Sequence, residues 1–273
     1  MKIVDAQVHM WAAGPPAIHH RQVPVFTDAE LLPEMDAAGV DAALIHPHLP
    51  WDPNANELAC DAARRHPQRF AVLGQLALER SESRTLIDGW RQRPGMLGLR
   101  FSLTRPEEQS WHIDGTMDWL WPAAERARLP VATMAWRFLP ILAEIAERHP
   151  DLRLIIDHCG LVRAAKDDDA FANLSELLPL ARLPNVAIKA TGAPGYSSAP
   201  YPFRNIHDGL WRIYDAYGPR RFFWGTDLTR MPCSYRQCVT MFTEELPWLS
   251  GADLELVMGR ALCDWIGWTA PFD

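Results

Sequence analysis

The chain opens with Met1-Lys2-Ile3-Val4-Asp5-Ala6-Gln7-Val8-His9, a short apolar run that ends in two polar side chains. This run predicts a β-strand over Ile3–His9. Because alternate residues of a strand share a face, Gln7 and His9 are expected to point the same way. Two imidazoles at these positions would form half of a zinc or manganese site. A neutral amide is a poor ligand, so the motif resembles half of a metal site that has lost one ligand.

Strand-like runs of this kind alternate with helical patterns along the whole chain. Their alternation over about 250 residues predicts an α/β fold, a (β/α)₈ TIM barrel that forms a single domain over residues 1–273. A doubly wound open sheet is the alternative, but no Gly-x-Gly-x-x-Gly follows the first strand. The further strands are expected at Asp41–His46, Phe70–Leu76, Leu97–Phe101, Val131–Met134, Leu152–His158, Val186–Ala190 and Phe222–Gly225.

The segments between these strands carry helical periodicity and several helix-stop signals. The stretches Ala13–Val25 and Thr191–Asn205 are rich in Pro, Gly and Ser and follow strands, so in a barrel they would lie on the catalytic face. Helices are expected at Asp28–Ala38, Asn56–His66, Ser83–Arg91, Met117–Arg128, Leu139–His149, Phe171–Ala181, Ile206–Tyr217, Cys238–Leu246 and Ala252–Trp265.

Composition excludes several classes of partner. The net charge of −7 disfavours nucleic acid and anionic membrane. No run has the length of a membrane span, and the first residues form a strand rather than a signal peptide, so a cytoplasmic location is expected. The five cysteines are odd in number and scattered, which predicts reduced thiols. The 12 tryptophans are mainly core residues, with exposed ones keeping a homo-oligomer open.

Polar side chains stand at the ends of six predicted strands. The carboxyl ends of barrel strands meet on one face, where the chemistry of such folds gathers. An aspartate that leaves an apolar strand near an imidazole suits a general base towards water, so Asp227 is the first candidate, with pairing to Arg230 as its structural alternative. The strand-end residues are Gln7 and His9, His46, Arg100, Asp157 and His158, Lys189, and Asp227.

These neighbours of Asp227 divide into three expected roles. His158 would orient water, donate to a carbonyl or bind a metal, whereas Asp157 beside it should face the opposite side. Lys189 would pair with a carboxylate or stabilise negative charge, because a buried unpaired ammonium is unfavourable. Arg100 and Arg230 are the first candidates to hold a substrate carboxylate.

Five short motifs in their order resemble the amidohydrolase superfamily over nearly the whole chain. They are Val4-Asp5-Ala6-Gln7-Val8-His9, Gly98-Leu99-Arg100-Phe101, Ile156-Asp157-His158-Cys159-Gly160, Asn185-Val186-Ala187-Ile188-Lys189 and Gly225-Thr226-Asp227. The resemblance is to the branch that includes pyrone-dicarboxylate lactonase, fuconolactonase and sulfomuconolactone hydrolase, with a lactone isomerase and a decarboxylase as relatives.

The resemblance also defines what this chain lacks. Metal-dependent members would have histidine at position 7 and another at the end of the fifth strand, where this chain has Thr133-Met134-Ala135-Trp136. The ligands that remain are His9, His158 and Asp227, which could hold one zinc or manganese ion. Since related lactonases work without a metal, no cofactor is favoured.

The resulting prediction is a hydrolase that opens a small, carboxylated lactone. Asp227 would activate water, while His158 and His9 polarise the carbonyl. Gln7, His46, Lys189, Arg100 and Arg230 would contact the anionic substrate. Lactone isomerisation or metal-dependent decarboxylation on the same barrel, and a small-acid binding protein, are the alternatives.

Overall fold

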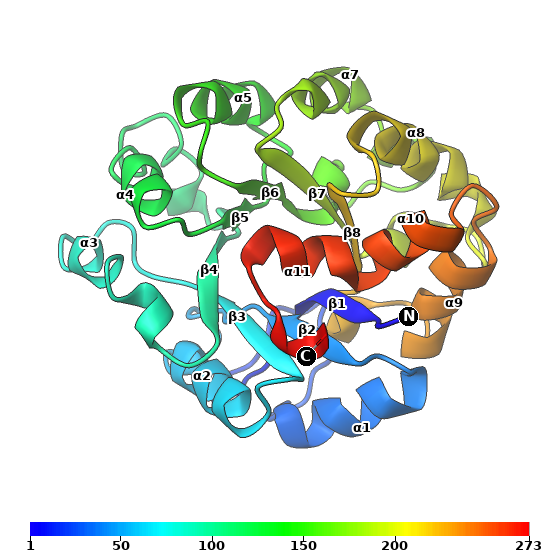
Figure 1. Cartoon of the computed structure of the whole chain (residues 1–273), viewed down its shortest axis with the longest axis horizontal. Helices are drawn as coiled ribbons and strands as arrows, with labels where there is room; N and C mark the ends of the chain where they lie inside the picture. Colours follow the sequence, from blue (N-terminus) through cyan, green and yellow to red (C-terminus); the bar gives the residue numbers. More distant parts are fainter. Residues whose placement is uncertain (273) are drawn as a thin grey trace.

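The computed structural model, which describes residues 1–272, contains eight parallel strands that follow one another around a barrel in sequence order (Figure 1). The last strand returns to the first, because the backbone N–H of Asp227 donates to the carbonyl of Gln7 at 2.9 Å. The predicted (β/α)₈ barrel is therefore confirmed. The strands are β1 Val4–Val8, β2 Ala42–Ile45, β3 Phe70–Gly74, β4 Met96–Phe101, β5 Val131–Thr133, β6 Leu154–Ile156, β7 Val186–Thr191 and β8 Phe222–Gly225.

Helices surround the barrel, and α11 crosses one of its ends (Figure 1). Leu262 and Ile266 of α11 belong to the same apolar cluster as Leu44, Ile155 and Phe223 of the strands, so this helix closes the barrel floor. The α-helices are α1 Asp28–Ala38, α2 Ala55–Arg65, α3 Ser83–Leu86, α4 Leu120–Arg126, α5 Leu139–Arg148, α6 Asp167–Ala170, α7 Leu174–Leu177, α8 His207–Tyr217, α9 Tyr235–Glu244, α10 Gly251–Glu255 and α11 Ala261–Ile266.

Four of the predicted helices are shorter or broken, and of these Met117–Arg128 is helical only over Leu120–Arg126. Ser83–Arg91 is helical only to Leu86, followed by a 3₁₀ turn at Trp90–Gln92. The predicted helix Phe171–Ala181 is split into α7 and a 3₁₀ turn at Leu178–Arg182, because Pro179 lacks the N–H that an α-helix needs there. The last predicted helix passes through a π-turn at Leu256–Arg260.

The π-turn has a packing reason. A Cβ on Gly259 would stand 2.8 Å from Cγ2 of Val4 and 3.0 Å from its backbone nitrogen. Glycine at this position therefore lets the helix approach the first residue of β1. This contact places α11 at the amino-terminal end of the strands.

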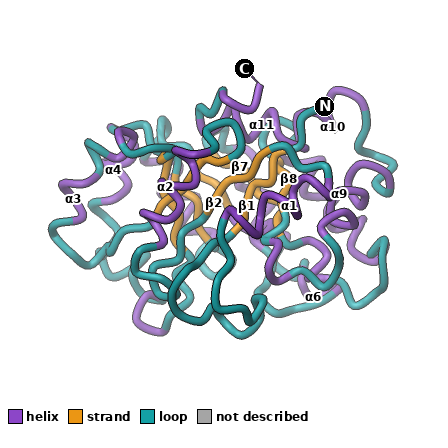
Figure 2. The backbone as a smooth tube through the Cα atoms, turned by 90° about the horizontal axis from the view of Figure 1, so that it is seen from below, coloured by secondary structure: helices purple, strands orange, loops and turns teal. Residues whose placement is uncertain are grey.

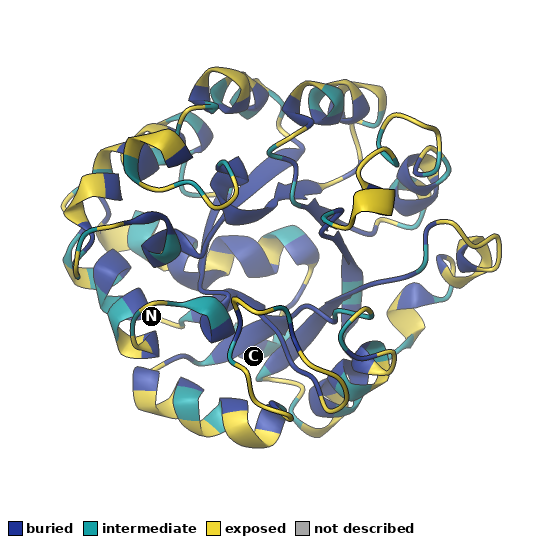
Figure 3. Cartoon of the chain, turned by 180° about the vertical axis from the view of Figure 1, so that it is seen from behind, coloured by how far each residue is buried: buried dark blue, intermediate teal, exposed yellow. Residues whose placement is uncertain are grey.

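Burial follows the layers of a barrel. The strands are buried on both faces, and exposed residues lie on the outer faces of the helices (Figure 3). Of the tryptophans in the described chain only Trp211 is exposed, which agrees with the prediction that they are mainly core residues. Within residues 1–272, every helix is too short or too polar to cross a membrane.

Candidate active site

A cavity of about 230 Å³, here named the central cavity, opens at the carboxyl ends of the strands. Long loops gather at this end, opposite α11 (Figure 2). Among the described residues of its wall there is one carboxylate against four guanidinium groups. Its lining comprises His9, Ala17, His19, His20, His48, Pro50, Trp51, Arg100, Ser102, Thr104, Arg105, Met134, His158, Arg163, Asp227 and Arg230.

His9 reaches the cavity from just beyond β1. Its Nδ1 lies 2.6 Å from the carbonyl oxygen of His46, so this nitrogen carries the proton and donates. Burial lowers the pKa of His9 well below its ordinary value, against the attraction of Asp227. The ring is therefore neutral, and its Nε2 presents a lone pair to the cavity.

His158 follows β6, where the chain leaves the extended conformation. The strand ends at Ile156, and His158 has a φ of 54°. Its backbone N–H donates to Oγ1 of Thr191 at 3.3 Å, and that hydroxyl lies 2.9 Å from Nδ1 of the same histidine. The same Nδ1 also lies 3.2 Å from the carbonyl oxygen of Thr191, so its contacts fit either tautomer: the hydroxyl can donate to Nδ1, or Nδ1 can donate to the carbonyl. Burial and the positive charge of Arg230 lower the pKa of His158 to about 4.

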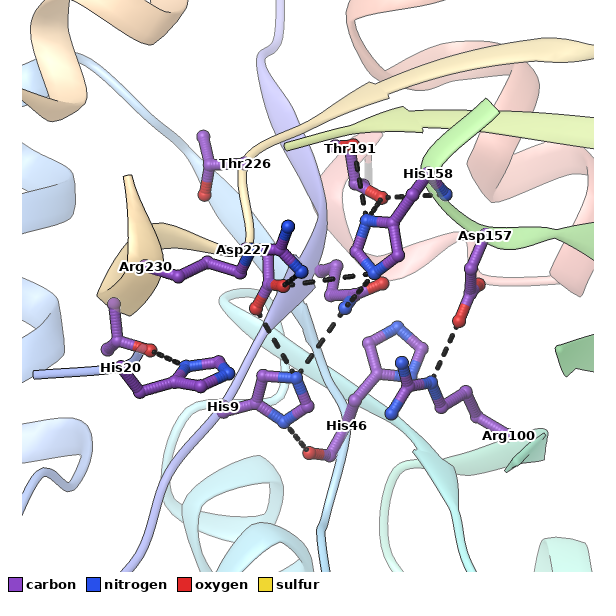
Figure 4. A network of polar contacts seen from close by, with 12 residues as sticks. His9, His20, His46, Arg100, Asp157, His158, Thr191, Thr226, Asp227 and Arg230 are labelled. Atoms are coloured by element: carbon purple, nitrogen blue, oxygen red, sulfur yellow. Dashed lines mark hydrogen bonds and ion pairs between the residues drawn. The ribbon is translucent and has the colours of Figure 1, made fainter. Parts of the chain in front are cut away.

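Asp227 follows β8 and stands between the two imidazoles (Figure 4). Its Oδ1 is 3.4 Å from Nε2 of His9, and its Oδ2 is 3.8 Å from Nε2 of His158 and 3.4 Å from Arg230. Burial would raise the pKa of this carboxyl, but the adjacent guanidinium of Arg230 opposes this, and the pKa lies below its ordinary value. Oδ1 has no hydrogen-bond partner within residues 1–272.

The position of Asp227 depends on a close approach of β8 to β1. A Cβ on Gly225 would lie 2.7 Å from the backbone nitrogen of Ala6 and 2.9 Å from Oδ1 of Asp5. Asp5 accepts hydrogen bonds from the N–H and hydroxyl of Thr226 at 2.8 and 2.5 Å. The residue before Asp227 is thus fixed to the first strand.

Gln7 lies beneath the two imidazoles. Its Oε1 accepts a hydrogen bond from Nζ of Lys189 at 2.9 Å, which fixes the amide so that Nε2 faces the rings. This amide nitrogen is 3.5 Å from Nε2 of both His9 and His158. A proton donor therefore occupies the position where a second metal-binding imidazole would otherwise stand.

A second buried carboxylate, Asp157, lies below this level in the barrel interior. Nε of Arg100 donates to its Oδ2 at 2.8 Å, and Nζ of Lys189 lies 2.7 Å from its Oδ1. The prediction that Asp157 faces away from the interior is therefore wrong. Asp157 faces the same inward side as Ile155 two residues before it, and it is His158, with its φ of 54°, that leaves the strand alternation.

The strand-end residues thus form two levels. His9, His158, Asp227, Arg100 and Arg230 line the central cavity as predicted. Direct substrate contact was also expected for three others, but the structure buries them beneath the cavity wall, which corrects that part of the prediction. These residues are Gln7, His46 and Lys189, each 0% exposed.

Two histidines of the cavity escaped prediction. His19 and His20 come from a loop, and the Nδ1 of His20 lies 2.7 Å from Oγ1 of Thr229. The available signal was the loop Ala13–Val25, which was expected on this face and carries His19-His20. Arg163 makes no ion pair with another described residue and is exposed, so its charge is open to a ligand.

The three candidate metal ligands do not fit a metal ion well. The amide N–H of Gln7 is directed at Nε2 of both His9 and His158, the nitrogens that would have to turn their lone pairs to a cation. Within residues 1–272, no group of three or more His, Cys, Asp or Glu side chains is arranged to hold a metal.

Comparison with known proteins places this geometry in a family. The chain is 26% identical over 234 residues to L-fucono-1,5-lactonase from Burkholderia ambifaria, covering 82% of this chain and 79% of that protein. It resembles an amidohydrolase from Burkholderia multivorans with bound Zn (TM-score 0.82, 20% identity, 98% of this chain and 100% of that chain).

A third relative is a probable 2-pyrone-4,6-dicarboxylic acid hydrolase from Acinetobacter baumannii with citric acid bound (TM-score 0.71, 16% identity, 98% of this chain and 100% of that chain). At these low identities the two solved structures establish a shared fold. The sequence profile of the family described as Amidohydrolase matches residues 4–267. The chain therefore belongs to the amidohydrolase family.

Proposed function

We propose that this protein hydrolyses a small lactone that carries a carboxylate. The observation that carries this proposal is Oδ1 of Asp227, a buried carboxylate oxygen without a hydrogen-bond partner within residues 1–272, in the wall of the central cavity. An oxygen in this position is ready to accept a proton from water. The likeness to L-fucono-1,5-lactonase supports a lactone as the substrate class.

The first step is attack by water. Asp227 Oδ1 and the Nε2 lone pair of His9 are two acceptors 3.4 Å apart, which favours a water molecule that donates to them. Asp227 removes one proton while the water oxygen forms a bond to the lactone carbonyl carbon. The carbonyl π electrons move to its oxygen, which gives a tetrahedral oxyanion.

A hydrogen-bond donor polarises the lactone carbonyl, and His9 and His158 differ in whether their contacts support a donor role. The contact of His9 Nδ1 with a backbone carbonyl supports an acceptor role for this ring. The contact of the Thr191 hydroxyl with His158 Nδ1 supports a proton on Nε2, which can donate to the oxyanion. Collapse of the oxyanion breaks the ring C–O bond, and protonated Asp227 returns its proton to the leaving oxygen.

The substrate carboxylate would bind guanidinium groups of the cavity. Arg230 is the first candidate because its contact with Asp227 is long, 3.4 Å, and its side chain is partly open to the cavity. Arg163 offers a second unpaired charge. A carboxylate on Arg230 would draw this cation from Asp227 and raise the pKa of Asp227, making it a stronger base when substrate is present.

We further propose that these steps need no metal. The donor set supports this proposal, because the amide N–H of Gln7 faces the centre where a cation would have to bind. Exhaustive chelation should leave turnover unchanged. Loss of activity that zinc or manganese restores would contradict the proposal.

A panel of five- and six-membered lactones with and without a carboxylate, followed by proton release, tests the activity. The Asp227→Asn variant should lose turnover, whereas Asp88→Asn, at an exposed aspartate away from the cavity, should retain it. Binding of lactones without hydrolysis would instead indicate a binding protein. Conversion without proton release would indicate an isomerase.

A further inference from the structure

We infer that the substrate is amphipathic, with an apolar substituent on the lactone ring that occupies a second cavity beside the first. This inference rests on the proposed lactonase function and adds the substrate class. The second cavity, here named the side cavity, has a volume of about 330 Å³. It is lined mainly by apolar residues, including Leu49, Leu76, Phe101, Leu103 and Trp111.

The two cavities share a wall. Pro50, Ser102 and Arg105 line both of them. A group that leaves the lactone ring in this direction therefore passes from one cavity to the other across these three residues. Arg105 is held at the boundary by its Nε, which donates to Glu108 at 2.9 Å.

The strand β4 explains why the cavities are adjacent. Arg100 lines only the central cavity, Phe101 lines only the side cavity, and Ser102 lines both. Successive residues at a strand end point to opposite sides, so β4 supplies a cation to one cavity and an aromatic ring to the next. The remaining wall comes from the loops after β2 and β3, such as Leu49 and Gln75.

The chemistry of the two cavities is complementary. The central cavity carries one acidic residue against four arginines, which suits an anion. The side cavity carries Glu79 and Glu108 against Arg80 and Arg105, so its formal charges balance. A neutral apolar group matches this second environment, because it gains from burial without leaving a charge unpaired.

The walls of the side cavity are partly preformed. Oε1 of Gln75 accepts from the backbone N–H of Leu49 at 3.0 Å, and the backbone of Gln75 bonds to the Asn56 side chain in both directions. Leu103 has a φ of 50°, an unfavourable conformation for leucine, and remains buried at the cavity wall.

Size gives an independent reason for a larger substrate. Ligand sites in proteins occupy roughly 300–1,000 Å³. The central cavity alone, at about 230 Å³, lies below this range, whereas the two cavities together fall within it. A lactone ring with its carboxylate fills the first, and a short alkyl chain or a phenyl group suits the second.

The test compares a carboxylated six-membered lactone with the same lactone bearing a hexyl or phenyl group. In the wild type the substituent should raise kcat/KM at least about tenfold, a factor that a few buried methylenes supply. Ala77→Trp places an indole in the side cavity and should abolish this gain, with the unsubstituted lactone within about twofold of wild type. Leu86→Trp, on exposed α3, is the matched control and should keep the gain.

Leu49→Arg is a second variant, which introduces a charge rather than bulk at a half-buried position. Calorimetric binding of the ring-opened hydroxy acids provides a readout that does not depend on turnover. No advantage of the substituent in the wild type, or equal effects of Ala77→Trp and Leu86→Trp, would overturn the inference. Tight binding of substituted acids that Ala77→Trp abolishes, with no lactone hydrolysed, would support the side cavity and reject the lactonase proposal.

Discussion

Two buried aspartates, Asp157 after β6 and Asp227 after β8, occupy similar places and have different surroundings. Both are at most 2% exposed, and in both the pKa lies below the ordinary value although burial opposes this. Asp157 contacts Arg100 and Lys189 at 2.8 and 2.7 Å. The ion contacts of Asp227 are all 3.4 Å or longer.

The difference separates a structural carboxylate from a reactive one. Lys189 and Arg100 engage Asp157 on both oxygens, so it cannot take a proton without leaving two cations unpaired in the interior. Oδ1 of each carboxylate lacks a well-aligned hydrogen bond within residues 1–272, but Oδ1 of Asp157 has the Lys189 ammonium at 2.7 Å, whereas Oδ1 of Asp227 lies in a cavity wall with no cation that close. Burial and residue type are the same, and the number of close cations sets the role.

The largest effect should follow from Asp227→Asn. Loss of the general base is expected to lower kcat on the best lactone by ~10²–10⁴-fold. The free energy of unfolding should change by only about 1 kcal/mol, because the ion contacts of this carboxylate are long and therefore weak. Steady-state kinetics and urea denaturation measure the two effects. Wild-type turnover in this variant would refute Asp227 as the base.

Asp157→Asn should have the opposite profile, a large loss of stability. Removing one partner of a buried ion pair leaves an uncompensated charge and destabilises by ~3–5 kcal/mol. Asp157→Asn combined with Lys189→Met should recover part of this loss in urea denaturation. Equal stability of the Asp157 and Asp227 variants would remove the distinction between the two carboxylates.

The contribution of the Asp157 carboxylate to the free energy of unfolding depends on pH, and the direction of this dependence can be predicted. The pKa of Asp157 is lowered in the folded protein, so its stabilising effect is present above the unfolded pKa of about 3.9 and disappears as pH falls further. The stability difference between wild type and Asp157→Asn should therefore narrow in acid. A difference that grows below that pH would contradict the ion-pair assignment.

Much of the barrel and of the surroundings of the two aspartates could be predicted from the sequence. Continuous apolar runs predicted the barrel strands, and the rule that strand ends share a face brought His9, His158 and Asp227 together. Asp157 was misplaced because the prediction made His158 the inward residue of the strand, whereas Ile155 and Asp157 face the interior and His158 follows the end of β6 at Ile156. Strand alternation is valid only inside a strand, and the end of a strand is the least certain part of a periodicity argument.

The contacts of loop residues were a second feature that the sequence could not predict. Nothing in the periodicity of Ala13–Val25 indicates that His20 turns back to Thr229, because this contact depends on loop closure between distant segments. The tautomer of His9 was also beyond sequence, since it follows from the contact of Nδ1 with the His46 carbonyl.

An intermediate effect is expected for Gln7→Leu, which removes the amide that joins the two levels. Leucine has nearly the same volume but can neither accept from Lys189 nor donate to His9. We expect kcat to fall on the order of 10–100-fold, as for other residues that orient a histidine. Nitrogen-15 NMR of the imidazoles should report a changed Nε2 chemical shift for His9, which loses its amide donor, and Gln109→Leu, at an exposed glutamine, should alter neither measurement. An unchanged imidazole spectrum with wild-type kcat would reject the orienting role.

The smallest effect should come from Arg230→Gln, which removes the nearest guanidinium from Asp227 and tests whether the two aspartates differ only in their cations. In the wild type the carboxylate of Asp227 and a neutral His158, whose pKa is about 4, persist well below neutrality, so kcat/KM should fall only in the acid range near that value. Arg230 lowers both pKa values, and its removal should therefore move the acid limb to higher pH.

The KM for a carboxylated lactone should rise roughly tenfold, the effect of one missing charge-assisted hydrogen bond. Arg220→Gln, at the opposite end of the barrel, is the matched control. If the acid limb stays in place while KM rises, Arg230 binds substrate without tuning the base, and the low pKa of Asp227 then depends on the neighbouring imidazoles.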